Sequence, residues 1–472
     1  MNRYNSLSIV SGPLLLLFAA GIGLGQVARN MDVTTASGPV KYIAKVPVNA
    51  STLPVRAAAS LAGIRLTYPA GAKSSRAIFA ASASPATGAD RTRPIRVPNN
   101  DGDQDDERSG GNIPGLVTVP TFAGAFAAQG AEDTGIVFPY VMVGNHPLRG
   151  GTTTVPAYIT AVSLQLLNPD GSVRADVPYA PFEELTLNSP NFQNADYTSG
   201  RGIQFTDAVQ RAEFFHSMQS DWHTRLEPQI VDRVTLQIPR FVQVEFPDNT
   251  VKTIQAYYLG RAPDGSFFLE LLDLLFNAVN DDLAVNEIVN NNFQTYAENA
   301  NVYPNTFLFS IDDTGKKSDC CVLGFHTYYF EDAVVPQPRI LFTFASWVSP
   351  GIFGGGFQDI TPLSHEISET FNDPFVDTAV PAWQFPGVPA NARVCQGNLE
   401  DGDPVEVLDN IAFPVTIYLD RRRPFTFHPQ TEALLQWFEM GSTSDAIGGA
   451  FSYPNTATLP KSALPCPPKP AP

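Results

Sequence analysis

Four side chains that can bind a metal ion or transfer a proton lie close together in residues 361–374. This segment reads T-P-L-S-H-E-I-S-E-T-F-N-D-P and contains His365, Glu366, Glu369 and Asp373. Residues four apart on a helix share one face, so His365 and Glu369 are spaced like the two ligands of an H-E-x-x-H zinc site. Glu366 takes the position of the general base that accepts a proton from a zinc-activated water. The carboxylate at the second ligand position makes the motif H-E-x-x-E.

A third ligand is expected further along the chain, because a catalytic zinc has three protein ligands and one open position. Residues 395–406, C-Q-G-N-L-E-D-G-D-P-V-E, offer two suitable carboxylates. Glu400 has the place of the downstream glutamate ligand of gluzincin-type sites. Asp403 would then accept a hydrogen bond from the His365 imidazole, or be the ligand itself. The predicted cofactor is Zn²⁺; in the alternative interpretation these acids only form a polar turn.

The H-E-x-x-E segment carries the boundary signals of a helix. Thr361 is the expected N-cap and Pro362 suits the first helical position, while Asp373 precedes a proline and therefore ends the helix. Three apolar residues recur at a spacing of four: Leu363, Ile367 and Phe371. They form a stripe about 160° around the helix from His365 and Glu369. We therefore predict a three-turn helix that packs on a core with one side and lines a cleft with the other; an ordinary surface helix, which has the same pattern, is the alternative.

Four cysteines are expected in an exported chain with disulfides: Cys320, Cys321, Cys395 and Cys466. The pairing of the neighbours Cys320 and Cys321 would be strained, which leaves two of the three possible pairings. Either of these links Cys395 to the neighbouring pair and brings residues 324–326 near the helix. His326, or alternatively Tyr328, could then stabilise an oxyanion. Free or metal-bound thiols are the alternative.

The N-terminus predicts export. Residues 1–26 contain Arg3 as a positive n-region, an apolar core at residues 13–24, and small residues at 23–25 for cleavage. We therefore expect a signal peptide at residues 1–25. The alternative is a signal anchor that stays in the membrane, since residues 8–25 are almost long enough to span it. Residues 26–130 are rich in Ala, Ser, Thr, Gly and Pro without a sustained period, and we expect a loosely ordered, low-complexity propeptide or linker.

Residues 131–472 have the pattern of a folded domain. Strand-like patterns cover residues 136–143, 157–167, 233–246, 250–261, 306–311 and 340–347. Helical patterns cover residues 203–223, 269–279 and 283–290, and Asp207 and Arg211 form an i,i+4 pair in the first of these. We therefore predict an α+β fold with a mixed sheet and a zincin-like active-site helix, preceded by a loosely ordered N-terminal region.

The charge of the chain limits its partners. A net charge of -17 and a pI near 4.7 argue against binding to nucleic acid or to an anionic membrane, since both need clustered Lys and Arg. We expect no nucleic-acid partner and no stable membrane insertion after signal cleavage. A peptide or an extracellular protein is the expected substrate.

The order of motifs in residues 319–440 resembles that of the plant EXORDIUM (phosphate-induced protein) family and of related bacterial secreted proteins. The matching positions are Cys321, Gly324-Phe325-His326, Ser346-Trp347-Val348, the H-E-x-x-E segment, Pro374, Ala382-Trp383, Glu400, Asp403 and Gln436-Trp437. The match covers about a quarter of the chain. It departs from the family in placing Cys395 before Glu400 rather than after the acidic pair. The resemblance implies an extracellular protein with a zincin-like site.

The sequence thus predicts a secreted, zinc-dependent, metallopeptidase-like hydrolase. Zn²⁺ would be held by His365, Glu369 and Glu400, with Glu366 as the general base. Two carboxylate ligands leave more negative charge at the metal than two histidines, so we expect a less acidic zinc-bound water and a slower or narrower enzyme. The alternative is a non-catalytic extracellular binding or structural protein with a degenerate or structural metal site.

Overall fold

The computed structural model describes residues 120–466 with gaps, and four short strands before them: β1 (Thr34–Thr35), β2 (Gly38–Pro39), β3 (Lys41–Tyr42) and β4 (Arg65–Thr67). The gaps are residues 130–134, 198–201, 247–249, 263–264, 274, 277–297, 313, 331–338, 354–355, 377, 388–394, 407, 409–410, 420–421 and 442–443. The predicted signal peptide, most of the predicted linker and the predicted helix at residues 283–290 lie outside the described residues. None of the described helices is long and apolar enough to cross a membrane.

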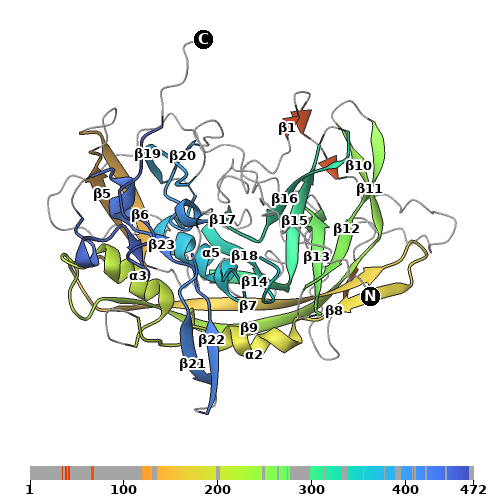
Figure 1. Cartoon of the computed structure of the whole chain (residues 1–472), viewed down its shortest axis with the longest axis horizontal. Helices are drawn as coiled ribbons and strands as arrows, with labels where there is room; N and C mark the ends of the chain where they lie inside the picture. The colour runs from red at the N-terminus through yellow and green to blue at the C-terminus, as the bar shows by residue number, and fades with distance from the viewer. Residues whose placement is uncertain are drawn as a thin grey trace, which may run out of the picture.

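A seven-stranded mixed sheet forms the floor of the molecule (Figure 1). Its order is β17-β18-β14-β7-β9-β4, and β8 pairs with β7. The strands are β7 (Thr152–Leu167), β8 (Val173–Val177), β9 (His223–Ile238), β14 (Glu298–Pro304), β17 (Gly324–Phe330) and β18 (Arg339–Trp347). β18, β14, β7 and β9 run parallel, whereas β17 and β4 are antiparallel edges. β7 and β9 each have 16 residues, so one pair of strands supports both halves of the fold.

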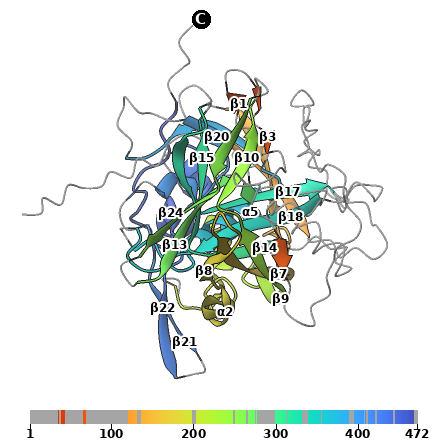
Figure 2. The ribbon, with the colours of Figure 1, turned by 90° about the vertical axis from the view of Figure 1, so that its right-hand side faces the viewer.

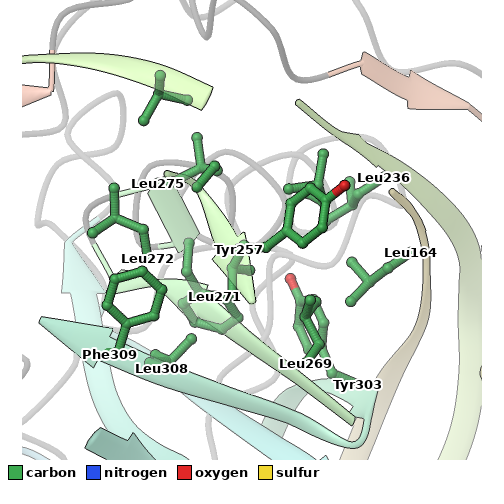
Figure 3. Packing of buried hydrophobic residues seen from close by; sticks show 14 of the residues in the cluster. Leu164, Leu236, Tyr257, Leu269, Leu271, Leu272, Leu275, Tyr303, Leu308 and Phe309 are labelled. Atoms are coloured by element: carbon green, nitrogen blue, oxygen red, sulfur yellow. The ribbon is translucent and has the colours of Figure 1, made fainter. Parts of the chain in front are cut away.

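One half of the fold packs small sheets over the ends of β7 and β9. A four-stranded sheet has the order β12 (Tyr257–Arg261), β13 (Phe267–Leu272), β15 (Thr306–Ile311) and β16 (Lys317–Val322). A three-stranded sheet joins β3 to β10 (Phe241–Glu245) and β11 (Val251–Gln255). Leu164 and Leu236 from the long strands belong to one large apolar cluster with Leu271 and Phe309 (Figure 3). This half is a core of buried aliphatic and aromatic side chains.

The other half carries the H-E-x-x-E helix. This helix, α5 (Thr361–Asn372), lies beside β17 and β18 (Figure 1). Of the other elements, α3 (Phe205–Glu213) and β6 (Val137–Val143) contact α5. The same half also contains β5 (Thr121–Ala127), β19 (Ala379–Gln384), β20 (Cys395–Asn398), the 3-10 turn η3 (Asp403–Val405), β23 (Glu432–Ala433), α6 (Leu435–Phe438), the 3-10 turn η4 (Ile447–Gly449) and β24 (Ser452–Tyr453). α2 (Ala180–Leu187) lies on the opposite side of the floor, and the hairpin β21 (Val415–Leu419) with β22 (Arg423–Phe427) projects from the body (Figure 1 and Figure 2).

The predicted helix at the motif is confirmed. α5 begins at Thr361 with a proline in its first turn and ends before Asp373. The N-cap is Ile360 rather than Thr361, because the Thr361 hydroxyl contacts the carbonyl oxygens of Gln358 and His428 at 2.7 and 2.6 Å instead. The predicted apolar stripe packs with Val302 and Trp347 of the main sheet. All twelve residues of α5 are buried, so the helix lies inside the protein instead of lining an open cleft.

Other elements agree with the prediction only in part. The strands predicted at residues 136–143, 157–167, 306–311 and 340–347 are present as β6, β7, β15 and β18, and strands dominate the described residues, which fits an α+β class. The region predicted as one helix over residues 203–223 contains α3 and then the start of β9. Asp207 binds His223 Nδ1 at 2.7 Å and Arg211 donates to the Trp222 carbonyl, so the predicted Asp207–Arg211 pair is absent from the contacts described.

The helix predicted at residues 269–279 is wrong over its first part, which is strand β13. β13 pairs with β12 on one side and with β15 on the other, and this pairing outweighs the local helical pattern. At the N-terminal side, β5 lies within the range predicted as linker and pairs along its length with β6. The folded part therefore includes residues before the boundary predicted at residue 131.

The disulfides correct the predicted pairings. Cys320 is joined to Cys321, and Cys395 is joined to Cys466. β19 brings the second pair together, because Gln384 pairs with Cys395 while the Cys466 amide donates to the Ala382 carbonyl at 2.9 Å. Cys395 is therefore not joined to Cys320 or Cys321. The expected bridge does not bring His326 to the helix.

Candidate metal centre

His365, Glu369 and Asp403 form the first of two groups around α5 that could hold a metal ion. One potential ligand atom from each of these residues lies within 4.8 Å of the others. His365 Nε2 lies 3.0 Å from Glu369 Oε1 and 3.7 Å from Asp403 Oδ1. The three side chains are buried, and His365 Nε2 and Asp403 Oδ1 have no hydrogen-bond partner. Separations of this size suit ligands placed about 2.0–2.2 Å from one shared cation.

The loop before η3 holds this group in place. The Gly402 amide donates to Glu369 Oε1 at 3.2 Å, and Gln396 donates to Asp403 Oδ2. Gly402 also packs flat on the His365 ring, where an added Cβ would lie 2.6 Å from three ring atoms. The glycine is therefore required by close approach, since its φ of -80° is open to any residue.

His326, Glu366 and Glu369 form the second group. His326 Nδ1 lies 3.2 Å from Glu369 Oε2 and 3.6 Å from Glu366 Oε2. His326 is on β17, opposite Thr343 of β18, and these two strands pack directly against α5. Gly324, two residues earlier on β17, allows this packing because an added Cβ would lie 2.5 Å from Glu366 Oε1.

Both ring nitrogens of His326 face oxygen atoms of the protein. Its Nε2 lies 3.3 Å from the Asp373 carbonyl oxygen and 3.8 Å from Glu400 Oε2. This environment favours a role in holding carboxylates or a cation over the predicted role in stabilising an oxyanion. Tyr328, the alternative for that role, packs edge-on against Phe375 in the apolar cluster under α5.

The two candidates for the third ligand occupy different places. Asp403 is grouped with His365 and Glu369, whereas Glu400 lies beside His326 with neither carboxylate oxygen hydrogen-bonded. The geometry therefore favours Asp403 as the partner of His365, and leaves Glu400 as a buried carboxylate next to the second group.

Burial and mutual repulsion act strongly on these carboxylates. Burial, followed by the charge of Glu369, raises the pKa of both Glu400 and Asp403 well above their usual range. Burial also favours a protonated Glu369, but the adjacent imidazoles of His365 and His326 outweigh it and lower the Glu369 pKa to about 2. Among the described residues, the ion pairs of these carboxylates involve only histidines.

The surroundings also shift the pKa values of the two histidines, His326 and His365. Burial alone would lower their pKa values. The neighbouring carboxylates of Glu366 and Glu369 raise the pKa of His326 well above its usual range, and the charges of Glu369 and Glu366 do the same for His365. A metal ion would therefore compete with protons for the same nitrogen atoms.

Further acids surround the two groups and were not predicted. Glu406 Oε1 lies 3.9 Å from His365 Nδ1, and Gln430 Nε2 lies 3.0 Å from the same nitrogen. Gln430 also donates to the Gly402 carbonyl at 2.8 Å. Behind α5, Asp401 accepts hydrogen bonds from Ser368 and Asn372, both at 2.6 Å. In the sequence these acids and amides do not have the spacing of a helix face. Their position beside the two groups therefore could not be predicted.

The remaining predicted residues have ordinary structural roles. The Asp373 carboxylate accepts the Thr378 amide at 3.2 Å, so Asp373 organises the turn after α5. The His365 side chain is 3% exposed, whereas the neighbouring Glu406 side chain is 24% exposed.

Comparison of the chain with models of protein families, with curated proteins and with solved structures finds no match. The site consists of buried His/Glu clusters that could hold a metal ion.

Proposed function

We propose that this protein is a zinc-dependent hydrolase of the metallopeptidase type, with zinc held by His365, Glu369 and Asp403. One observation carries the proposal: a histidine nitrogen and two carboxylate oxygens from a helix and a separate loop converge within 4.8 Å in a buried place. Burying such groups without a partner is costly, and a bound cation removes that cost. Zinc fits the donor set of one imidazole and two carboxylates.

Glu366 is the residue proposed to move the proton. Its Oε1 lies 4.0 Å from His365 Nε2, next to the proposed metal position but outside the group of His365, Glu369 and Asp403. A zinc ion there would supply Lewis-acid activation of water and of a substrate carbonyl. Burial raises the pKa of the Glu366 carboxyl, against the opposing charge of His365, which makes its carboxylate a stronger base than one in water.

The burial of α5 and His365 supports a second candidate function. A hydrolase needs a path for its substrate, whereas a structural metal site is saturated by protein ligands and sealed. The burial of α5 and the low exposure of His365 favour a structural role for the metal. In this alternative the ion joins α5 to the loop of Asp403 and supports folding, without turnover.

Replacement of Glu366 separates the two candidates. Glu366→Gln should retain zinc at the site of His365 and Asp403, measured by elemental analysis of the purified mature protein, and should lose hydrolysis of a peptide library. Glu184→Gln, a change on an exposed ion pair with Arg423, is the control and should retain both. If Glu366→Gln still hydrolyses peptides, the proposed base is wrong. If the wild type holds zinc, loses thermal stability with a chelator and hydrolyses nothing, the structural role is correct.

Secretion is also a proposal. The two disulfides support an oxidising compartment, and the sequence of residues 1–25 supports export. The resemblance to the EXORDIUM family supports the same location, with a peptide or extracellular protein as substrate. N-terminal sequencing of the exported protein tests this, since a mature chain that begins near residue 26 is expected.

A further inference from the structure

We propose that the site holds two metal ions, bridged by the carboxylate of Glu369, with His365 on one ion and His326 on the other. This inference rests on the proposed metal site and deepens it. The sequence motif provides only one metal position, and the second position arises because β17 lies against α5.

The two oxygens of Glu369 face different histidines. Oε1 lies 3.0 Å from His365 Nε2, and Oε2 lies 3.2 Å from His326 Nδ1. The carboxylate therefore belongs to both groups of potential ligands. A carboxylate that offers one oxygen to each of two cations is suited to a pair of ions about 3.5–4 Å apart, as in two-metal sites.

The hydrogen bonding of His326 leaves one nitrogen for a metal. Its Nε2 faces the Asp373 carbonyl oxygen at 3.3 Å, and a carbonyl only accepts, so this nitrogen carries the proton. In the neutral imidazole, which is the form that binds a metal, Nδ1 then has the lone pair, and it is buried beside the carboxylates of Glu366 and Glu369. A backbone acceptor on the far nitrogen is the usual support of a metal-bound histidine.

Each position has a further carboxylate on its outer side. Asp403 lies next to His365 at 3.7 Å, and Glu400 lies next to His326 at 3.8 Å with both oxygens unpaired. Glu366 lies beside both positions, 4.0 Å from His365 Nε2 and 3.6 Å from His326 Nδ1. These distances are longer than those of Glu369, so Glu369 is the bridge and Glu366 remains the proposed base.

The charge at the site matches two divalent ions. Glu366, Glu369, Glu400 and Asp403 are all buried, and the ion pairs found for them in the described residues involve only histidine. When these carboxylates are ionised they carry four negative charges. One divalent cation would balance two of these four charges, whereas two cations would balance all four; Asp401 and Glu406 lie outside the two positions. Uncompensated buried charge is strongly unfavourable.

Metal stoichiometry tests the proposal directly. The full mature protein is saturated with Zn²⁺, freed of excess metal by gel filtration and analysed for zinc per chain. We expect two ions in the wild type and one in His326→Gln or Asp403→Asn. His223→Gln removes a histidine that pairs with a buried aspartate elsewhere and should retain two. A wild type that saturates at one ion, with His326→Gln also at one, would overturn the second position.

A spectroscopic measurement on the wild type tests the bridge even if a variant fails to fold. In the Mn²⁺-loaded protein, electron paramagnetic resonance should report two spin-coupled ions, and His326→Gln should give the signal of an isolated ion. Two uncoupled ions would exclude Glu369 as a bridge. Peptide hydrolysis with a single zinc would refute the second metal and keep the proposed function. Two coupled ions without any hydrolysis would keep the two-metal site and refute the proposed hydrolase function.

Discussion

Gly402→Ala should weaken metal binding without unfolding the protein. The backbone of Gly402, with φ -80° and ψ -36°, is open to alanine. The new methyl group, however, would lie 2.6 Å from Cγ, Nδ1 and Cε1 of the His365 ring. The substitution therefore acts on the position of the ring rather than on the backbone conformation.

The size of the effect follows from this contact. Ordinary contact with a Cβ begins at 3.4 Å, so the ring and the loop must separate by about 0.8 Å (3.4 minus 2.6). Metal–ligand distances tolerate about 0.2 Å, so the shift takes His365 Nε2 out of range of an ion shared with Asp403. Disturbed ligand support typically costs about 10- to 100-fold in metal affinity, which corresponds to about 1.4–2.7 kcal/mol.

Competition with a chromophoric chelator measures the Zn²⁺ affinity of the wild type and the variant. Gly397→Ala is the matched control, because its Cβ would meet only the Val380 carbonyl oxygen at 3.8 Å. We expect this control to bind zinc as the wild type does. Circular dichroism of both metal-free variants checks that the fold is intact.

Two results would refute this reasoning. An unchanged zinc affinity in folded Gly402→Ala would mean that the His365 ring does not need this position, and therefore that it is not a ligand. An equal loss in Gly397→Ala would mean that β20 and its loop respond to any added methyl group, so that the effect is not specific to the ring.

Three other predictions concern stability. Burial raises the pKa of Asp401 from 3.8 to about 7, so between these pH values the folded state keeps a proton that the unfolded state releases. The stability of the metal-free protein should therefore fall as the pH rises through this range. Calorimetry that shows a rise in stability would contradict this. Ile367→Ala, in the buried stripe of α5, should cost about 2–5 kcal/mol in urea unfolding, whereas Tyr418→Ala at an exposed position should change it by less than about 0.5 kcal/mol. Loss of the Cys395–Cys466 bridge, which spans 71 residues, should cost up to about 4 kcal/mol in guanidinium unfolding, and peptide mapping without reductant should recover these two cysteines linked.

Local sequence was sufficient to predict α5. A proline in the first turn, a following Asp-Pro and apolar residues at a spacing of four determine its length and one of its faces. The same reasoning placed β15 and β18, because their apolar runs are short and bounded by turns. The prediction was wrong for β13, because its leucine-rich run fits a helix and a strand equally well. Pairing with its neighbours β12 and β15 decides between them.

The surroundings of the site depended on contacts between distant segments. The preference for Asp403 over Glu400 comes from the turn at Gly402, which directs one carboxylate to His365 and leaves the other beside His326. From the sequence, His326 was expected near the helix because of a disulfide that does not form. The pairing of β17 with β18 beside α5 places it there instead.

The sequence by itself therefore determined a helix that carries a histidine and two carboxylates, and a later segment with further acids. Only the tertiary structure decided that the helix is buried on every side, that Asp403 meets His365, and that Glu369 lies between two histidines. The physical reason is that the period of a helix fixes which of its own residues share a face. Which other elements meet that face depends on strand order and on the packing of the whole chain.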